Sequence, residues 1–290
     1  MFRTWTLSGL SWKEFFQRLW VQMNEDDVWG RAAQLSYYFL LALFPLLLFL
    51  VTLLGYFTDA SEELRNSLLS YLGRVMPPSA LDLVNTTLDE VGNRKGGGKL
   101  SFGLLVTLWA ASNGMGAISQ TLNIAYEVEE SRPWWKVRLV SVGLTILLAV
   151  LIISALVLVL YGSRLASLIA WYAGLGDTFV LGWKILQWPI VLGFLLFGFG
   201  CLYFFAPNLR HQRWEWVTPG AAVAVALWLL ASLGFRAYLY FFNSYSATYG
   251  SLGALIILML WFYLTGMAVL VGGEINSELE RAAKKLNVND

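Results

Sequence analysis

The stretch at residues 101–127 reads SFGLLVTLWAASNGMGAISQTLNIAYE, and its character changes halfway along. Its first half, through Ala111, is apolar enough to lie in hydrocarbon. The second half carries these small and polar residues: Ser112, Asn113, Gly114, Gly116, Ser119, Gln120 and Asn123. As one helix the stretch would be roughly 40 Å long, which exceeds the hydrocarbon core of a bilayer. The polar half must face other helices or a wet cavity, because lipid cannot satisfy amides and hydroxyls.

A spacing of i, i+4, i+7 and i+11 places part of this set on one face of the helix as a polar stripe: Ser112, Gly116, Ser119 and Asn123. Apolar residues cover the other side: Met115, Ile118, Leu122 and Ala125. Two interpretations stay open: the stripe is a seam for close helix packing, or it also lines a route for a substrate. We expect the stripe to face the first and last membrane spans.

The composition is that of an integral membrane protein. Hydrophobic residues make up 58% of the chain and charged residues 13%, with a mean hydropathy of +0.60; soluble domains carry about 25% charged residues. A net charge of +1 gives no reason to expect nucleic acid as a partner. The single cysteine, Cys201, excludes an internal disulfide and leaves no cysteine-based metal motif. The N-terminus lacks the pattern of a removable signal peptide.

Hydropathy predicts an all-α, polytopic protein with six transmembrane helices. The spans lie at about residues 35–57, 101–127, 139–160, 180–205, 217–241 and 252–272. Pro45 should kink the first of them. Residues 11–23 predict an N-terminal amphipathic helix that opens with a capping box at Ser11 and Glu14. This helix lies in the membrane interface or packs under the bundle.

Residues 59–100 predict a helical extracytoplasmic loop, in which two amphipathic stretches are broken by Pro77 and Pro78 and followed by a glycine-rich joint at 92–99. Residues 161–179 predict a short interfacial helix. Thr218 and Pro219 are typical of a helix start. Residues 1–280 would form a single membrane-embedded domain, and 281–290 a cytoplasmic tail.

The distribution of Lys and Arg predicts the orientation. They are concentrated in the short segments on the side that holds both termini, so both termini should be cytoplasmic. Arg236 would lie near the outer end of the fifth span, where it can snorkel or serve a substrate path.

This topology brings distant polar residues to one depth. The first span begins at the cytoplasmic side with Arg31, Gln34 and Tyr37, the central helix ends there, and so does the last span, with Glu274 and Asn276. We therefore predict a cytoplasmic-side polar cavity with one acid and one base; a structural ion pair is the open alternative. The substrate-path candidates are Arg31, Gln34, Tyr37, Ser112, Asn113, Ser119, Gln120, Asn123, Arg236, Tyr245, Thr248, Tyr249, Glu274 and Asn276. The last loop, with Tyr245, could gate the outer end or form an aromatic belt.

Several motifs together resemble one family. They are AAQLSYY at 32–38 followed by LFP at 43–45, Asn123-x-x-Tyr126 with Arg132-Pro133, Pro207-Asn208, Pro219-Gly220, YSATYGSLG at 245–253, and GEIN at 273–276. They resemble the YihY/BrkB family of bacterial inner-membrane proteins, over roughly residues 20–280; the last motif departs from the commoner Gly-Ala-Glu-Leu-Asn. The resemblance implies six helices with cytoplasmic termini. Members have been named virulence factors and, historically, a ribonuclease, and the family has been linked to moving lipids or other amphiphiles.

Nuclease chemistry does not fit the residues. Metal-assisted cleavage needs clustered carboxylates or histidines, whereas the sole histidine is His211 and no cluster has ligand spacing. We expect no enzymatic activity, no metal and no cofactor. We expect a transporter or flippase for a lipid or other amphiphilic substrate, passive or ion-coupled, since no ATP motif is present. The alternative is a structural or envelope-assembly protein. Membrane lipids are the expected partners, and an oligomer is possible.

Overall fold

The computed structural model describes residues 11–57, 69–70, 97–174, 176–209, 217–241 and 251–289. Within these ranges the chain forms α-helices and no strand, which confirms the all-α prediction. The helices are α1 (Trp12–Glu25), α2 (Val28–Phe57), α5 (Gly97–Ala125), α6 (Trp134–Ala173), α7 (Asp177–Phe205), α8 (Pro219–Phe241) and α10 (Ser251–Asn289).

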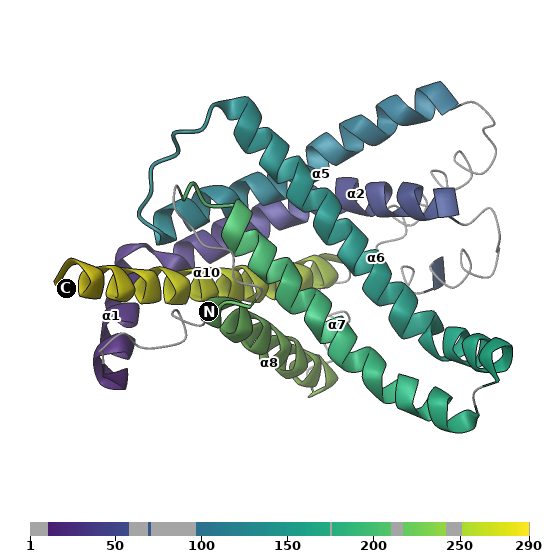
Figure 1. Ribbon diagram of the computed structural model, residues 1–290. Coiled ribbons are helices and arrows are strands. Elements are labelled where there is room, and N and C mark those ends of the chain that lie inside the picture. Colours follow the sequence, from purple (N-terminus) through teal and green to yellow (C-terminus); the bar gives the residue numbers. More distant parts are fainter. Residues whose placement is uncertain are drawn as a thin grey trace.

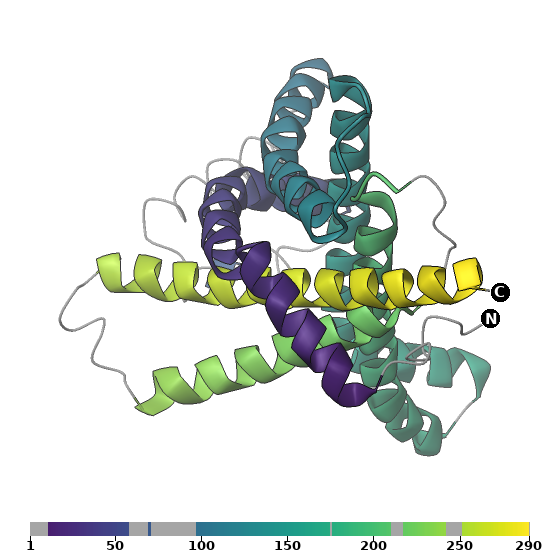
Figure 2. The same cartoon turned by 90° about the vertical axis from the view of Figure 1, so that its left-hand side faces the viewer.

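Helix α10 is the central member of the bundle (Figure 1). It packs against α2 on one side and α8 on the other, while α5 joins α2 to α6, and α6 pairs with α7. Helix α1 crosses the C-terminal half of α10 (Figure 2). The best-buried side chains come from five helices that meet near one end of the bundle: Leu35, Leu122, Tyr203, Ala224 and Leu270.

Four helices are long and apolar enough to cross a membrane among the residues searched: Trp134–Val159, Thr178–Phe205, Pro219–Tyr238 and Leu255–Ala283. Only 17% of the most apolar window in the first of these is buried inside the protein. Exposed leucine, isoleucine and valine side chains therefore form its outer surface, which suits lipid rather than water. The chain is thus a multi-pass membrane protein. Helices α2 and α5 coincide with the other two predicted spans, and the count of six stays a prediction.

The amphipathic N-terminal helix is confirmed as α1, with its capping box. The Ser11 hydroxyl accepts from the Glu14 amide at 3.2 Å, and the Glu14 carboxylate accepts from the Ser11 amide at 3.0 Å. The hydrogen bond from the Ser11 backbone lowers the pKa of Glu14. One edge of the apolar stripe, including Phe15 and Leu19, is buried against the bundle, whereas the other edge, including Trp20, is exposed.

The separate short helix predicted at 161–179 is wrong, because α6 continues to Ala173 without a break. Gly162 does not interrupt the helix. It lies under α7, where an added Cβ would come within 2.5 Å of the Gln187 amide oxygen. The helix ends at Gly174, whose φ of 67° is the left-handed conformation that glycine adopts at helix C-termini.

The helix that carries the last predicted span does not end with that span near residue 272, since α10 continues to Asn289. Its second half buries Ile275, Leu279 and Ala282 against neighbouring helices, so packing extends the helix beyond the apolar run. Helix α2 passes through Pro45 as one element, and α5 begins at Gly97, inside the predicted glycine-rich joint. Most of the predicted loop at 59–100 lies outside the described residues.

Candidate functional site

Polar side chains gather at one end of the bundle, which we call the polar end. There α2, α6 and α8 begin, α5 and α7 end, and α1 and the second half of α10 pack across them. Hydrogen bonds join these elements in two groups, centred on Arg132 and on Asn276, and a third group of charged side chains surrounds Glu274.

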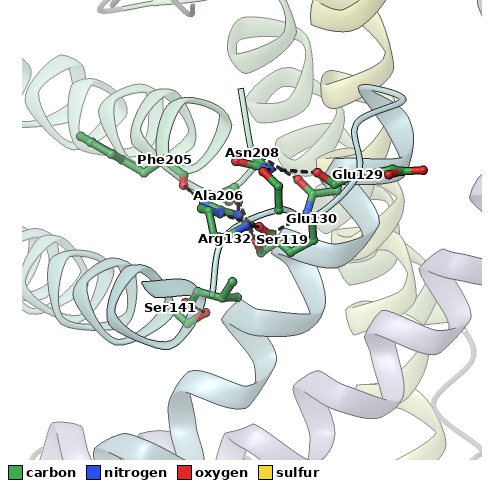
Figure 3. A network of polar contacts seen from close by, with 11 residues as sticks. Ser119, Glu129, Glu130, Arg132, Ser141, Phe205, Ala206 and Asn208 are labelled. Atoms are coloured by element: carbon green, nitrogen blue, oxygen red, sulfur yellow. Dashed lines mark hydrogen bonds and ion pairs between the residues drawn. The ribbon is translucent and has the colours of Figure 1, made fainter. Parts of the chain in front are cut away.

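Arg132, in the turn between α5 and α6, closes the C-terminal end of α7 (Figure 3). Its guanidinium donates to the Ala206 carbonyl at 2.9 Å and forms two bonds with the Glu130 carboxylate, at 2.8 and 2.6 Å. The Ser119 hydroxyl of α5 donates to the same Ala206 carbonyl at 2.6 Å. A cation at a helix C-terminus satisfies carbonyls that have no partner within the helix. The hydrogen bonds from Arg132 lower the pKa of Glu130.

Asn123 continues the Arg132 group and is itself buried. Its amide donates to the Glu130 carboxylate at 2.8 Å, and its carbonyl accepts from the Asn208 backbone amide at 2.7 Å. The Asn208 side chain in turn donates to the Glu129 carbonyl at 2.8 Å and to Ser131 at 2.9 Å. The end of α5, the turn after it and the segment after α7 are therefore fixed to one another.

The stripe on α5 does not face the first and last spans as predicted. Ser119 and Asn123 point to the ends of α6 and α7, and a Cβ on Gly116 would lie 3.7 Å from the Ser141 hydroxyl of α6. The opposite face meets α2 and α10: a Cβ on Gly114 would lie 3.1 Å from Ala42, and one on Gly273 would lie 2.7 Å from Leu122. The physical reason is that the carbonyls at the end of α7, which have no partner within the helix, supply acceptors that the apolar sides of α2 and α10 lack.

Asn276 joins α10 to the start of α8. Its carbonyl accepts from the Gly220 amide at 2.8 Å, and its amide donates to the Thr218 hydroxyl at 3.0 Å. Thr218 also accepts from the Ala221 amide at 3.1 Å, which confirms it as the cap of α8. Asn276 therefore holds two helices together.

Glu274 is enclosed at the centre of the polar end. It is 1% exposed, and neither carboxylate oxygen has a hydrogen-bond donor among the described residues. The Asp26 carboxyl lies within hydrogen-bonding reach of it, and Glu127 and Arg281 are the next charged groups. The Arg281 guanidinium, however, is bonded elsewhere: to Gln22 and Glu127 at 3.0 Å each, to Ser277 at 3.0 Å and to the Ala125 carbonyl at 3.3 Å.

Several predicted path residues lie away from Glu274. Gln34 and Tyr37 are on the exposed face of α2, and Gln120 and Arg236 are exposed as well. Arg31, the predicted basic partner, donates to the Asp26 carbonyl at 2.6 Å. The predicted pairing of one acid with one base in an open cavity is therefore wrong for the described side chains, because the acid is enclosed and its neighbour is another acid.

Two further candidates make local contacts. Ser112 donates to the Trp109 carbonyl in its own helix at 2.8 Å, and Asn113 accepts from Arg138 at 2.7 Å. Arg138 also stacks on the Trp109 ring, 3.7 Å from its centre. Tyr245, Thr248 and Tyr249 lie outside the described residues.

The sequence reasoning missed the partners that organise the site. The run Asn24-Glu25-Asp26-Asp27 is typical of a helix start, and nothing in its sequence indicates that Asp26 lies beside Glu274. Arg281, two helical turns beyond Glu274, was assigned to the tail. The spacing Glu130-x-Arg132-Pro133 directly before a span was the available signal for the clamp on α7.

An apolar hollow on the outer side of α7 does not overlap this site. It is lined by Phe179, Gly182, Trp183, Ile185, Leu186 and Pro189. In the part of the chain that the structure describes, no group of three or more His, Cys, Asp or Glu side chains could hold a metal ion.

Comparison with known proteins places the chain among bacterial membrane proteins. A sequence model described as "Virulence factor BrkB" matches residues 19–289. YfkH of Bacillus subtilis, whose name describes it as ribonuclease-like, is 39% identical over 94% of this chain and 96% of its own length. A UPF0761 membrane protein of Vibrio campbellii is 32% identical over 91% of this chain and 82% of its own, and one of Alteromonas mediterranea is 31% identical over 89% and 85%. No solved structure matches the chain.

Proposed function

Since the chain belongs to the BrkB virulence factor family, we propose that it moves a lipid or other amphiphile across the bacterial inner membrane, passively or coupled to an ion. The proposal includes six membrane spans, with α2 and α5 as the additional two, and cytoplasmic termini. With this topology the polar end lies on the cytoplasmic side. Membrane lipids surround the helices and supply the substrate.

The observation that carries the proposal is the buried acid on a membrane-spanning helix. Glu274 lies within Leu255–Ala283, is 1% exposed and has no hydrogen-bond donor among the described residues. Enclosing an unpaired carboxylate costs several kcal/mol. Ionisable residues inside membrane spans are rare and commonly mark substrate or ion pathways. A purely structural helix would be more stable with an apolar residue in this position.

The second candidate is a structural or envelope-assembly protein, and the stripe on α5 favours it. Ser119 and Asn123 have all their neighbours within the protein and join α5 to the end of α7 rather than line an opening. Such fully satisfied polar contacts are typical of helix packing in membranes.

Catalysis is not part of the proposal. The name of YfkH refers to a ribonuclease-like protein, but phosphodiester cleavage through metal ions requires a ligand cluster, and the described residues contain none. We propose no nucleic acid partner and no cofactor.

The test is lipid flipping in liposomes that contain the purified full chain and a fluorescent phospholipid. An impermeant reductant added outside bleaches only the outer leaflet, so a flippase raises the bleached fraction above that of protein-free liposomes. We expect the unmodified protein to raise it and Glu274→Gln to reduce that increase. Glu278→Gln is the matched control, because Glu278 lies one turn further along α10 and pairs with Arg18 at 3.7 Å. Correctly folded protein that flips no lipid or amphiphile tested would favour the structural alternative.

A further inference from the structure

The Glu274 carboxyl faces another acid instead of a cation. Asp26 ends α1 and lies within hydrogen-bonding reach of Glu274 on α10. An ionised carboxylate only accepts hydrogen bonds, so two carboxyls bond to each other only when one of them carries a proton. With both ionised, two adjacent negative charges would repel each other in an enclosed position, and one of the two would take up a proton.

Among the described residues, no neighbouring cation removes this requirement. Arg281 is the charged group on α10 that attracts Glu274, but its donors are bonded to Gln22, Glu127, Ser277 and the Ala125 carbonyl. Arg31 donates to the backbone carbonyl of Asp26. From the end of α5, Glu127 adds negative charge beside Glu274.

In the part of the chain that the structure describes, acidic groups therefore outnumber basic groups around the pair. The charged groups that act on Glu274 are Asp26, Glu127 and Arg281, while Arg31 bonds the backbone of Asp26 and Glu274 acts in turn on Tyr126. With Glu274 included, the carboxyls exceed the guanidiniums, and a bound proton reduces the difference.

The second unsatisfied group is a hydroxyl. Tyr126, at the end of α5, is 7% exposed, and its hydroxyl has no hydrogen bond of ordinary length among the described residues. Glu274 is among the acids that act on it. Asp26 is half-buried, whereas Glu274 and Tyr126 are both buried.

We propose that Glu274, enclosed beside Asp26, binds one proton and is the proton-binding site of this protein. The inference rests on the proposed transport function and names its coupling ion. Loss of the proton leaves two adjacent carboxylates, whose repulsion separates α10 from the junction of α1 and α2.

A metal cation suits the site less well. Hard cations bind about six or more oxygen ligands, largely carboxylates, carbonyls and waters. The described side chains here provide two carboxyls and one hydroxyl, and no three-residue cluster with metal-binding arrangement.

Infrared difference spectroscopy of the full chain in liposomes tests the proposal without any transport substrate. A protonated carboxyl has a C=O stretch that is separate from that of a carboxylate and shifts in D₂O. We expect this band at neutral pH and its loss as the pH is raised. Glu274→Gln should remove it, whereas Glu278→Gln should retain it. Asp26→Asn removes the neighbouring charge and offers an amide donor, so its band should disappear at lower pH than in the unmodified protein.

Three results would overturn the proposal: no band at neutral pH, a band that persists in Glu274→Gln, or a band that sodium removes at constant pH, which would indicate a metal cation site. Should Glu274→Gln fail to assemble, Asp26→Asn carries the same test at a half-buried position. A protein that shows the band but flips no lipid refutes the transport function alone. One that flips lipid without the band refutes the proton site alone.

Discussion

Gly272→Ala should destabilise the protein, because α8 and α10 are in close contact at this glycine. A Cβ added there would meet the Tyr203 hydroxyl, lie 2.6 Å from the Gly220 carbonyl oxygen and lie 2.8 Å from the Ala224 Cβ. Two of these three neighbours belong to the backbone or first side-chain carbon of α8, so they cannot rotate away. The helices must separate, or α10 must shift along α8.

The expected cost follows from three contributions. Overpacking a tight interface costs about 1–3 kcal/mol. The Tyr203 hydroxyl donates to the Val269 carbonyl at 2.7 Å, and losing a buried hydrogen bond of this kind costs about 1–3 kcal/mol. Replacing glycine by alanine within a helix stabilises the helix by about 1 kcal/mol, which offsets part of this cost. We therefore expect a net loss of about 3 kcal/mol in the free energy of unfolding.

Unfolding of the purified protein in mixed micelles, followed by circular dichroism as the denaturing detergent is increased, measures this difference. Gly234→Ala is the matched control on α8, since an added Cβ there meets nothing within 4 Å. The control should be neutral or more stable by up to about 1 kcal/mol. Equal stability of the two variants would refute the close approach of α8 and α10 and the packing role of Gly272.

Three further predictions concern the polar end and the topology. Arg132→Lys should lower the free energy of unfolding by about 1–2 kcal/mol, because an ammonium cannot reproduce the paired bonds to Glu130 together with the bond to Ala206; unchanged stability in the same micelle titration would contradict the clamp. The pKa of Glu130 is lowered by Arg132, so its contribution is present above the ordinary glutamate pKa of about 4.3 and is lost as the pH falls through the folded-state pKa. Melting curves of Glu130→Gln should accordingly show a weaker loss of stability on acidification than those of the unmodified chain; parallel curves would rule this out. Single cysteines at Asn93 and Asn289 in a Cys201→Ser background should differ in labelling by an impermeant reagent on intact spheroplasts, with only the first labelled, and equal labelling would overturn the topology.

The elements were predictable where one physical signal dominated. The capping box defined the start of α1, the Thr218-Pro219 pair defined that of α8, and apolar runs located α6, α7 and α10. The ends of α6 and α10 were not predictable from hydropathy. A helix continues as long as its backbone hydrogen bonds and its packing continue. Gly162 and Gly272 lie near the predicted span ends, but in the structure they are contact points between helices.

The main error at the site was the prediction of which helices the polar stripe of α5 faces. Periodicity identified which residues of α5 share a face, but it carries no information on which neighbour meets that face. The partners of Ser119 and Asn123 are a backbone carbonyl at Ala206 and a backbone amide at Asn208. Backbone groups have no sequence signature, so only the position of the end of α7 reveals them.

The contrast between the two polar groups separates the two candidate functions. In the Arg132 group, the described side chains are matched donor to acceptor, and such a network contributes stability and specificity without any need for movement. The Glu274 carboxyl has no such donor among the described residues, and the neighbouring Asp26 carboxyl repels it when both are charged. Packing alone gives no reason to keep an acid there, since an apolar residue of similar volume would be at least as stable. A protein that only assembles the envelope needs the first group, whereas a protein that changes conformation as it gains and loses a proton needs the second as well.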